Sequence, residues 1–252
     1  MQDEIAQKLL HINQEFYQRF GEAFAETRRR IQPGVARVLA EFIHDGDWLD
    51  LGCGSGALLT SWVKSGTRGS YTGMDFSAEL LAEAHKNLSE QPDHEGLEVQ
   101  YLQADLIKSD WSNKLPKKQY DGILAFASLH HLPGSMNRRR IVEQALSLLK
   151  PGGVFIHSEW QFQHSAKMMN RVLPWSTVGI DEEELEEGDT LLDWRHAAAG
   201  QKSEPGLRYV HLFSREELST LAECVNARLT GEFESDGKGG NLALYQVWDK
   251  NI

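Results

Sequence analysis

The chain has few of the residues that disulfide or metal scaffolds require. Its 252 residues include only two cysteines, Cys53 and Cys224, too few for a disulfide framework or a zinc cluster. No apolar run approaches the ~20 residues that span a membrane. The acidic start Met1–Glu4 is not followed by an apolar stretch, which predicts no signal peptide. These absences predict a cytoplasmic protein that has no contact with membrane.

Positive charge is also scarce. Lysine and arginine number 26 against 37 aspartates and glutamates, a net charge of −11. Proteins with broad phosphate-binding surfaces usually carry a basic patch, so any contact with nucleic acid must here be local. A hydrophobic content of 40% is ordinary for a globular protein. The length is sufficient for one large domain with an ample core.

The most informative stretch is Trp48–Leu59, where a short apolar run meets three glycines at alternate positions before a helical pattern begins. This pattern predicts a strand, a tight turn and a helix. Glycine lets the backbone approach a ligand closely, and the helix N-terminus offers it unpaired N–H groups. A second apolar run, Tyr71–Asp75, ends in an acid suited to accept hydrogen bonds from both ribose hydroxyls.

Two kinds of cofactor fit this pattern. Gly52, Gly54 and Ala57 satisfy the loose dinucleotide fingerprint G-x-G-x-x-G/A, which alone is a weak signal. Asp50 and Gly56 extend it to D-x-G-x-G-x-G, which resembles motif I of the class I S-adenosylmethionine (SAM) methyltransferases. Three later stretches resemble that family's adenine-contacting motif, its fourth strand and the turn before its fifth strand: Gln103–Leu106, Tyr120–Leu124 and Leu148–Gly153. A methyltransferase is therefore preferred to a dehydrogenase.

The resemblance implies SAM as cofactor and S-adenosylhomocysteine as product. In that family the acid of motif I helps to hold the methionine amino group. For Arg28, a contact with the SAM carboxylate or a substrate anion and a solvated basic turn both remain open, and Cys53 is most simply a small filler. The cofactor-binding residues proposed are Arg28, Asp50, Gly52, Cys53, Gly54, Gly56, Asp75, Phe76, Ser77, Asp105, Leu106 and Ala127.

Strand patterns alternating with helical ones predict an α/β fold, a doubly wound and mostly parallel sheet with helices on both faces. By resemblance the sheet has seven strands and ends in an antiparallel hairpin of 228–234 and 242–248. One methyltransferase domain is expected, divided into an N-terminal helical cap (1–46), a SAM-binding core (47–160), an insertion over the active-site mouth (161–209) and a C-terminal helix and hairpin (210–252). The acidic run 181–187 within the insertion predicts a solvated or mobile segment, or one that repels anionic ligands.

The stretch Phe126–Leu132 follows the predicted fourth strand, where the methyl acceptor would lie. His130 or His131 could act there as a general base, because imidazole titrates near neutrality; packing or cofactor contact is the alternative. Adjacent histidines lack the i, i+4 spacing of a helical metal pair, so no metal is predicted.

Five further stretches resemble a narrower family, the tRNA wobble-uridine carboxymethyl methyltransferases, which include the methyltransferase domain of eukaryotic AlkB-homologue proteins. They are Phe24–Arg28, Arg138–Arg140, Arg208–Phe213, Gly240–Leu242 and, more weakly, Gly188–Trp194. In that family SAM methylates a carboxylate on a modified uridine of tRNA, which gives a methyl ester.

A carboxylate acceptor is already anionic at pH 7, so it needs only desolvation and alignment, not a base. Arginines would hold the acceptor or nearby phosphates, and rings would stack on a flipped-out base. An exposed helix start and a packed strand are the alternative interpretation of these residues. The substrate-binding candidates are Arg138, Arg139, Arg140, Trp194, Arg208, Tyr209 and His211. A small-molecule O-, N- or carboxyl-methyltransferase and a non-catalytic SAM-binding protein remain as alternatives to a tRNA-modifying enzyme.

Overall fold

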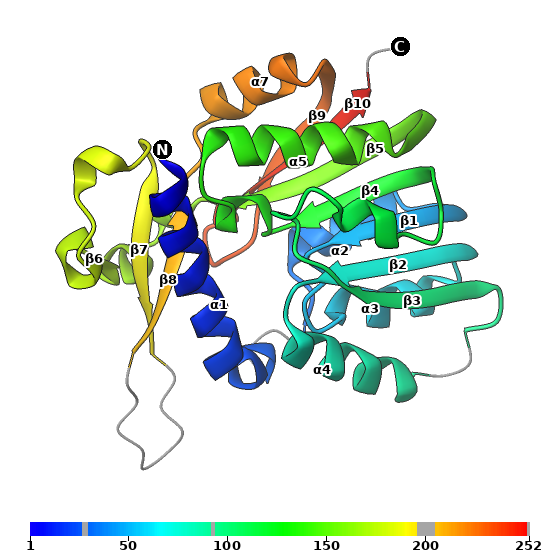
Figure 1. Ribbon diagram of the computed structural model, residues 1–252. Helices are drawn as coiled ribbons and strands as arrows, with labels where there is room; N and C mark the ends of the chain where they lie inside the picture. The colour runs from blue at the N-terminus through cyan, green and yellow to red at the C-terminus, as the bar shows by residue number, and fades with distance from the viewer. Residues whose placement is uncertain (27–29, 92–93, 196–204, 251–252) are drawn as a thin grey trace.

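The computed structural model describes residues 1–26, 30–91, 94–195 and 205–250. A seven-stranded sheet forms its centre, in the order β3-β2-β1-β4-β5-β10-β9 (Figure 1). The strands β1 to β5 are parallel, and β10 runs antiparallel to both β5 and β9. The predicted doubly wound sheet and its closing hairpin are therefore confirmed. The strand bounds are β1 Gly46–Leu51, β2 Gly69–Asp75, β3 Leu97–Gln103, β4 Tyr120–Phe126, β5 Leu149–Trp160, β9 Ala227–Ser235 and β10 Ala243–Lys250.

Helices cover both faces of this sheet (Figure 1). On one face α2 (Pro33–Glu41), α3 (Ala57–Ser65) and α4 (Ala78–Ser89) enclose a core around Trp48 and Trp62. On the other, α5 (Ser135–Ser147) and α7 (Arg215–Cys224) pack over Ile123 and Phe155. Ser77 caps α4 as predicted, since its Oγ accepts a hydrogen bond from the N–H of Leu80 at 3.2 Å.

The predicted insertion contains a second, antiparallel sheet of β6 (Val172–Leu173), β7 (Asp189–Trp194) and β8 (Gly206–His211). The helix α1 (Asp3–Glu26) lies beside β8 and also packs on α4 (Figure 1). Its apolar face continues to Ala25, which is buried. Among the described residues, no helix combines the length and apolar character of a membrane span.

Short helices complete the connections between these elements. They are η1 (Trp111–Lys114), η2 (Leu129–His131), η3 (Phe162–His164), α6 (Ala166–Met169), η4 (Trp175–Val178) and η5 (Glu182–Glu184). The strand order reverses at β1, which has β2 on one side and β4 on the other. Ligands of doubly wound sheets bind outside the carboxyl ends of the strands at such a switch point.

The ring of Trp48 on β1 lies directly over Gly122 of β4, its register partner, where a side chain would leave it no room. A Cβ added to Gly122 would lie 2.1 Å from Cζ3 of Trp48, which is fully buried. We therefore expect Gly122→Ala to lower the free energy of unfolding by about 1–3 kcal/mol, the usual cost of overpacking. Urea unfolding measures this loss. Gly231→Ala is the matched control, since its Cβ would meet only Val247, at 3.4 Å. A loss in Gly122→Ala that the double variant with Trp48→Phe does not partly restore would contradict the explanation.

Candidate active site

A cavity of about 240 Å³ lies at the carboxyl ends of β1, β2 and β4. One part of its wall comes from the glycine loop and the ends of β2 and β3, and the other from α1, η2, Trp160 and β8. The structure brings many of the predicted site residues together here: Gly52, Gly54, Asp75, Phe76, Asp105, Leu106, Ala127, His130, His131 and Arg208.

The glycine loop is tied to β2, because the N–H groups of Gly52 and Cys53 both donate to the carbonyl of Met74, at 2.7 and 3.0 Å. Gly52 has φ +79°, and a Cβ there would lie 2.2 Å from Oγ of Ser128. Gly54 has φ +55° and no atom within 4 Å of its Cβ position, so a ligand could approach its backbone closely. Gly56 does not line the cavity; its Cβ position lies against Tyr101.

Asp75 connects the loop to the cavity. Its Oδ2 accepts from the N–H of Gly54 and its Oδ1 from the N–H of Ser77, both at 2.9 Å. Burial raises the pKa of Asp75, and these backbone hydrogen bonds act in the opposite direction. Each carboxylate oxygen can accept a further hydrogen bond, as two ribose hydroxyls would require. Ser77 itself does not line the cavity but orients Asp75.

Asp50 lies beneath the loop and does not line the cavity. It is 3% exposed, and the hydroxyl of Tyr71 donates to its Oδ2 at 2.6 Å. Burial raises the pKa of Asp50 to about 7, although the Tyr71 hydrogen bond opposes the shift. Burial also raises the pKa of the Cys53 thiol, whose Sγ packs against Gly73. Cys53 does not line the cavity.

The two histidines of η2 are oriented by different neighbours. His130 is 1% exposed, its Nδ1 lies 3.0 Å from Oε2 of Glu159, and its ring stacks on Trp160. The Nε2 atom of His131 lies 3.3 Å from the Tyr17 hydroxyl, and its Nδ1 atom lies 3.2 Å from the carbonyl oxygen of Tyr209. Since that carbonyl can only accept, Nδ1 of His131 carries a hydrogen.

Arg208 places a positive charge in the cavity wall. It is 2% exposed, and its guanidinium lies 5.2 Å from the Trp160 ring centroid and 5.6 Å from that of Phe24. These three residues also line a neighbouring cavity of about 230 Å³, whose wall includes Trp194. Trp194 also packs edge-on against Phe16 of α1.

Helix α1 supplies cavity residues that the sequence did not identify: Leu10, Asn13, Gln14 and Tyr17. Leu10 and Tyr17, the two apolar members, are spaced like residues on the core-facing side of an ordinary helix. The one available signal was Asn13, a polar residue on that side. Its amide donates to the carbonyl of Tyr209 and accepts from the N–H of the same residue, at 3.1 and 2.9 Å.

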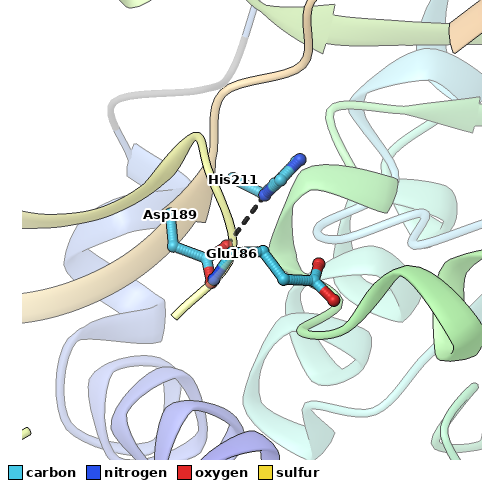
Figure 2. Close-up of side chains that lie close together, drawn as sticks. All are labelled: Glu186, Asp189 and His211. Atoms are coloured by element: carbon cyan, nitrogen blue, oxygen red, sulfur yellow. Dashed lines mark hydrogen bonds and ion pairs between the residues drawn. The ribbon is translucent and has the colours of Figure 1, made fainter. Parts of the chain in front are cut away.

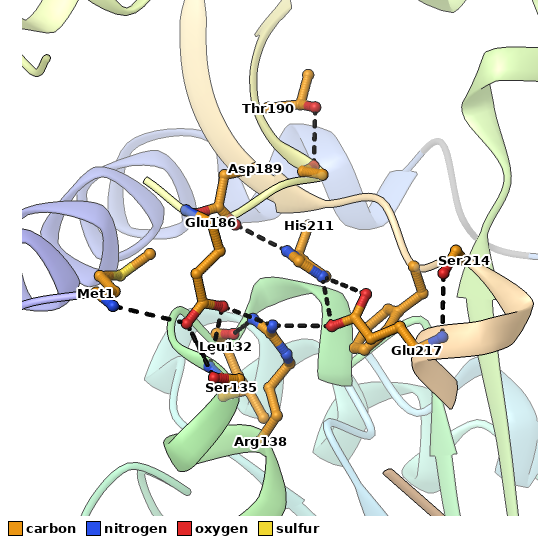
Figure 3. Close-up of polar contacts among 12 residues, drawn as sticks. Met1, Leu132, Ser135, Arg138, Glu186, Asp189, Thr190, His211, Ser214 and Glu217 are labelled. Carbon is orange, nitrogen blue, oxygen red and sulfur yellow. Dashed lines mark hydrogen bonds and ion pairs between the residues drawn. The ribbon is translucent and has the colours of Figure 1, made fainter. Parts of the chain in front are cut away.

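Three substrate-binding candidates, Arg138, Tyr209 and His211, lie in an ion network and are not among the residues that line the cavity. Figure 3 shows Arg138 and His211 in this network. Arg138 donates to Glu186 and Glu217 at 2.7 and 3.0 Å. The hydroxyl of Tyr209 donates to Asp189, and the His211 ring lies between Asp189 and Glu217. The side chains of Arg138, Tyr209 and His211 are thus committed to contacts within the protein. The same network holds Glu186, so that end of the acidic run is not simply solvated.

Glu186, Asp189 and His211 have potential metal ligand atoms within 4.8 Å of one another (Figure 2). Each of these atoms already has a partner within the protein. Glu186 accepts from Arg138 and Ser135, while Asp189 accepts from Tyr209 and pairs with His211. The positive charge of Arg138 compensates the carboxylates, so ion pairing within the protein explains the cluster.

Of the remaining predicted arginines, Arg139 and Arg140 are not among the residues that line the cavity. Arg139 is exposed and pairs with Glu143 one turn further along α5. Arg140 donates to the carbonyl of Ile107 at 2.6 Å and so supports the loop after β3. Arg28 lies outside the described residues.

Residues 49–155 match a family of methyltransferase domains. A malonyl-[acyl-carrier protein] O-methyltransferase from Halalkalibacterium halodurans is 34% identical over 110 residues, 44% of this chain and 37% of that protein. A tRNA (carboxymethyluridine(34)-5-O)-methyltransferase from Arabidopsis thaliana is 28% identical over 182 residues, 71% of this chain and 39% of that protein. The chain therefore spans less than half the length of either relative.

The fold has a close counterpart among solved structures. A S-adenosylmethionine-dependent methyltransferase from Clostridium acetobutylicum superposes with a TM-score of 0.65 at 15% identity, covering 94% of this chain and 99% of that one. At this identity the match establishes the fold, which is that of the class I methyltransferases.

Asp50 should make stability depend on pH. Its pKa is about 7 in the folded chain against 3.8 for the ordinary side chain, so its contribution to stability is present at low pH and is lost as pH rises toward 7. We expect Asp50→Asn to raise the free energy of unfolding at pH 8 by more than about 1 kcal/mol, since one pKa unit corresponds to ~1.4 kcal/mol. The gain should be smaller at pH 5. Urea unfolding at both pH values measures the change in the free energy of unfolding. The control is Asp249→Asn, which removes one member of the surface ion pair with Arg228. Equal effects at both pH values would refute this origin.

Proposed function

Because residues 49–155 carry a methyltransferase domain within a class I methyltransferase fold, we propose that the protein transfers the methyl group of SAM to an acceptor. The observation that carries this proposal is the composition of the cavity. Its wall joins the glycine loop, Asp75 and Asp105 to His130, His131 and Arg208. One part has the groups that a nucleoside cofactor requires, and the other has groups suited to a polar acceptor.

The cofactor part fits SAM residue by residue. Asp75 would accept hydrogen bonds from the ribose hydroxyls, the open backbone at Gly54 would lie against the cofactor, and Asp105–Ile107 would enclose the adenine. Asp50, beneath the loop, would face the methionine ammonium, and a cation there would favour its ionised form. When bound, SAM supplies the methyl group of its sulfonium. The sulfur keeps the electrons of the broken bond and becomes a neutral thioether.

For the acceptor we propose a carboxylate or similar nucleophile, in particular that of a modified wobble uridine of tRNA. The buried charge of Arg208 supports this, because a charge-assisted hydrogen bond to a carboxylate is strong in a site shielded from water. The alignment with the Arabidopsis enzyme, over 71% of this chain, supports it as well. Trp194, in the neighbouring cavity that shares Arg208 and Trp160, would contact the body of the acceptor.

The residues of the acceptor part would act by orientation. A carboxylate oxygen displaces the thioether in line and forms a methyl ester, and no proton moves. Arg208 and His130 would hold the second oxygen, and Leu10, Tyr17 and Leu132 would exclude water. The ester product is neutral, so it loses its charge attraction to Arg208, which favours its release.

A small-molecule acceptor is the second candidate. The net charge of −11 disfavours an extended polyanion as partner. The O-methyltransferase from Halalkalibacterium halodurans, whose name gives a malonyl group on an acyl-carrier protein as substrate, matches 44% of this chain.

Labelling separates these candidates. The purified protein is incubated with methyl-labelled SAM and either total tRNA or a small-metabolite extract from its host. Label that enters tRNA and is released by mild base indicates a methyl ester, the expected result. Base-stable label in tRNA would keep tRNA as partner but change the acceptor atom. Label in small metabolites alone would support the second candidate.

We expect Asp75→Ala to weaken SAM binding by about 1–3 kcal/mol, because the ribose hydroxyls lose a charged acceptor. Calorimetry measures the affinity. Asp75→Asn retains the shape of the loop and should lose less, and Asp249→Ala, on an exposed ion pair, should lose nothing. An unchanged affinity in Asp75→Ala would remove this residue from the cofactor site.

Arg208→Gln should reduce methyl transfer by about 10- to 150-fold, the effect of losing one hydrogen bond to a charged group. SAM affinity should stay unchanged, because Arg208 belongs to the acceptor part. The labelling assay measures the rate, and thermal unfolding checks that the variant folds. The control is Arg228→Gln on β9, whose guanidinium pairs with Asp249 at the surface. Full activity in Arg208→Gln would exclude a role in holding the acceptor.

A further inference from the structure

Glu159 is a buried carboxylate with a histidine at each of its oxygens. His157 Nδ1 lies 3.1 Å from Oε1, and His130 Nδ1 lies 3.0 Å from Oε2. Glu159 and His157 are fully buried, and His130 is 1% exposed. Carboxylates are almost never buried so completely unless they are paired. Of the three side chains, His130 alone lines the active-site cavity, so the other two reach the site only through it.

The direction of the hydrogen bond from His157 can be derived. Nε2 of His157 has no hydrogen-bond partner among the described residues, and its ring packs against Phe155 and Trp248. Burial lowers the pKa of His157 to about 3, so the ring is neutral and carries one hydrogen. A hydrogen on Nε2 would be a buried donor with no acceptor, whereas a hydrogen on Nδ1 has Oε1 of Glu159 to bond. His157 therefore donates to Glu159 and holds its position.

The other oxygen of Glu159 fixes the ring of His130. Nδ1 of His130 lies 3.0 Å from Oε2 and also accepts from the backbone N–H of Trp160 at 3.4 Å, and the ring stacks on Trp160 with an interplanar angle of 15°. Any polar contact of His130 with an acceptor in the cavity is therefore made through Nε2. This is the arrangement in which a buried carboxylate sets the orientation and the proton of an imidazole.

We propose that Glu159 is a positioning residue of the active site, which holds a hydrogen on Nε2 of His130 so that this nitrogen donates to the acceptor. This inference rests on the proposed function for the identity of the cavity. A carboxylate acceptor suits such a donor, because the Nε2–H group and Arg208 could each bond the oxygen that is not methylated. An acceptor that must first lose a proton would instead need a lone pair on Nε2.

Glu159 and His130 share one proton, and the hydrogen on Nε2 of His130 is present whichever of the two residues carries that proton. Burial raises the pKa of Glu159 well above its ordinary value. A hydrogen bond from the backbone of His130 and the charge of Arg138 oppose this shift, and the charge of Glu217 adds to it. If the proton is on Glu159, the carboxyl donates to Nδ1 of His130 and Nε2 carries the ring hydrogen. If the proton is on His130, both ring nitrogens carry hydrogens. Only the loss of this one proton converts Nε2 into an acceptor, so the two residues titrate as a unit.

Other charged or titratable groups face this pair from several elements. His131 lies beside His130 on η2, with ring centroids 4.6 Å apart, and Arg208 of β8 lies across the ring of Trp160. Arg138 of α5 and Glu217 of α7 act on Glu159 through their charges. They remain in place when Glu159 alone is replaced, so a comparison of variants isolates its contribution.

The test is nitrogen-15 NMR of the histidine rings in the full chain, recorded across a pH series without any acceptor. Spectra of His130→Gln and His157→Gln assign the two rings. In the wild type we expect His157 to be neutral with its hydrogen on Nδ1. In Glu159→Gln we expect the His130 ring to lose its positive charge about 1–3 pH units lower, the effect of removing a charge partner within hydrogen-bonding distance. The Gln amide, whose oxygen accepts from His157, should donate to Nδ1 of His130 and leave the remaining hydrogen on Nε2. The control Asp193→Asn replaces another buried carboxylate, on β7, and should leave the midpoint of His130 unchanged.

Two results would overturn the proposal: an unmoved His130 midpoint in Glu159→Gln, or a His157 hydrogen found on Nε2. The second is read from the wild type alone, so the proposal stays falsifiable if the Gln variant does not fold. Because no acceptor is used, the outcome is independent of the labelling assay, and failure of the proposed function would show there instead. In that assay, Glu159→Gln should remove the alkaline limb of the kcat/KM profile, because the amide keeps the hydrogen on Nε2 of His130 at every pH, and should leave SAM affinity unchanged.

Discussion

The two-way pairing of Asn13 with the backbone of Tyr209 holds the acceptor part of the cavity in place. Its amide satisfies both the N–H and the carbonyl of one residue in β8, and the carbonyl also accepts from His131. The backbone of a single residue thus fixes α1, η2 and β8 relative to one another. Arg208 precedes that residue and is positioned by it. The apolar contacts of α1 could be made in several registers, but these hydrogen bonds allow one.

The two parts of the cavity differ in how far they follow from sequence. The cofactor part is local: Gly52, Gly54, Asp75 and Asp105 each sit at the end of a parallel strand, and parallel strands end at one edge of the sheet. The acceptor part depends on contacts between residues that are far apart in the sequence, separated by 118 positions in one case and 196 in another. Asn13 and Tyr17 were therefore not recognised, because nothing in their local pattern distinguishes a cavity wall from a core.

Charged residues were the least predictable. Arg138 and Arg208 are both arginines in stretches that resemble the tRNA wobble-uridine methyltransferases. Arg138 nevertheless lies in an ion network, whereas Arg208 lines the cavity. A guanidinium suits either role, and only the positions of Glu186 and Glu217 decide between them. The network joins α5, α7 and the second sheet. Buried ion pairs add little net stability but penalise alternative packings, so its effect is to fix where the second sheet sits.

The position of β10 has a consequence for biosynthesis. This strand is the last in the described chain, yet it lies between β5 and β9 in the sheet. While the ribosome is still making it, β5 has an unpaired edge and β9 has no partner that connects it to the sheet. The nascent chain must therefore keep this strand edge exposed until β10 has been made, which makes it a natural client for chaperones that bind such edges.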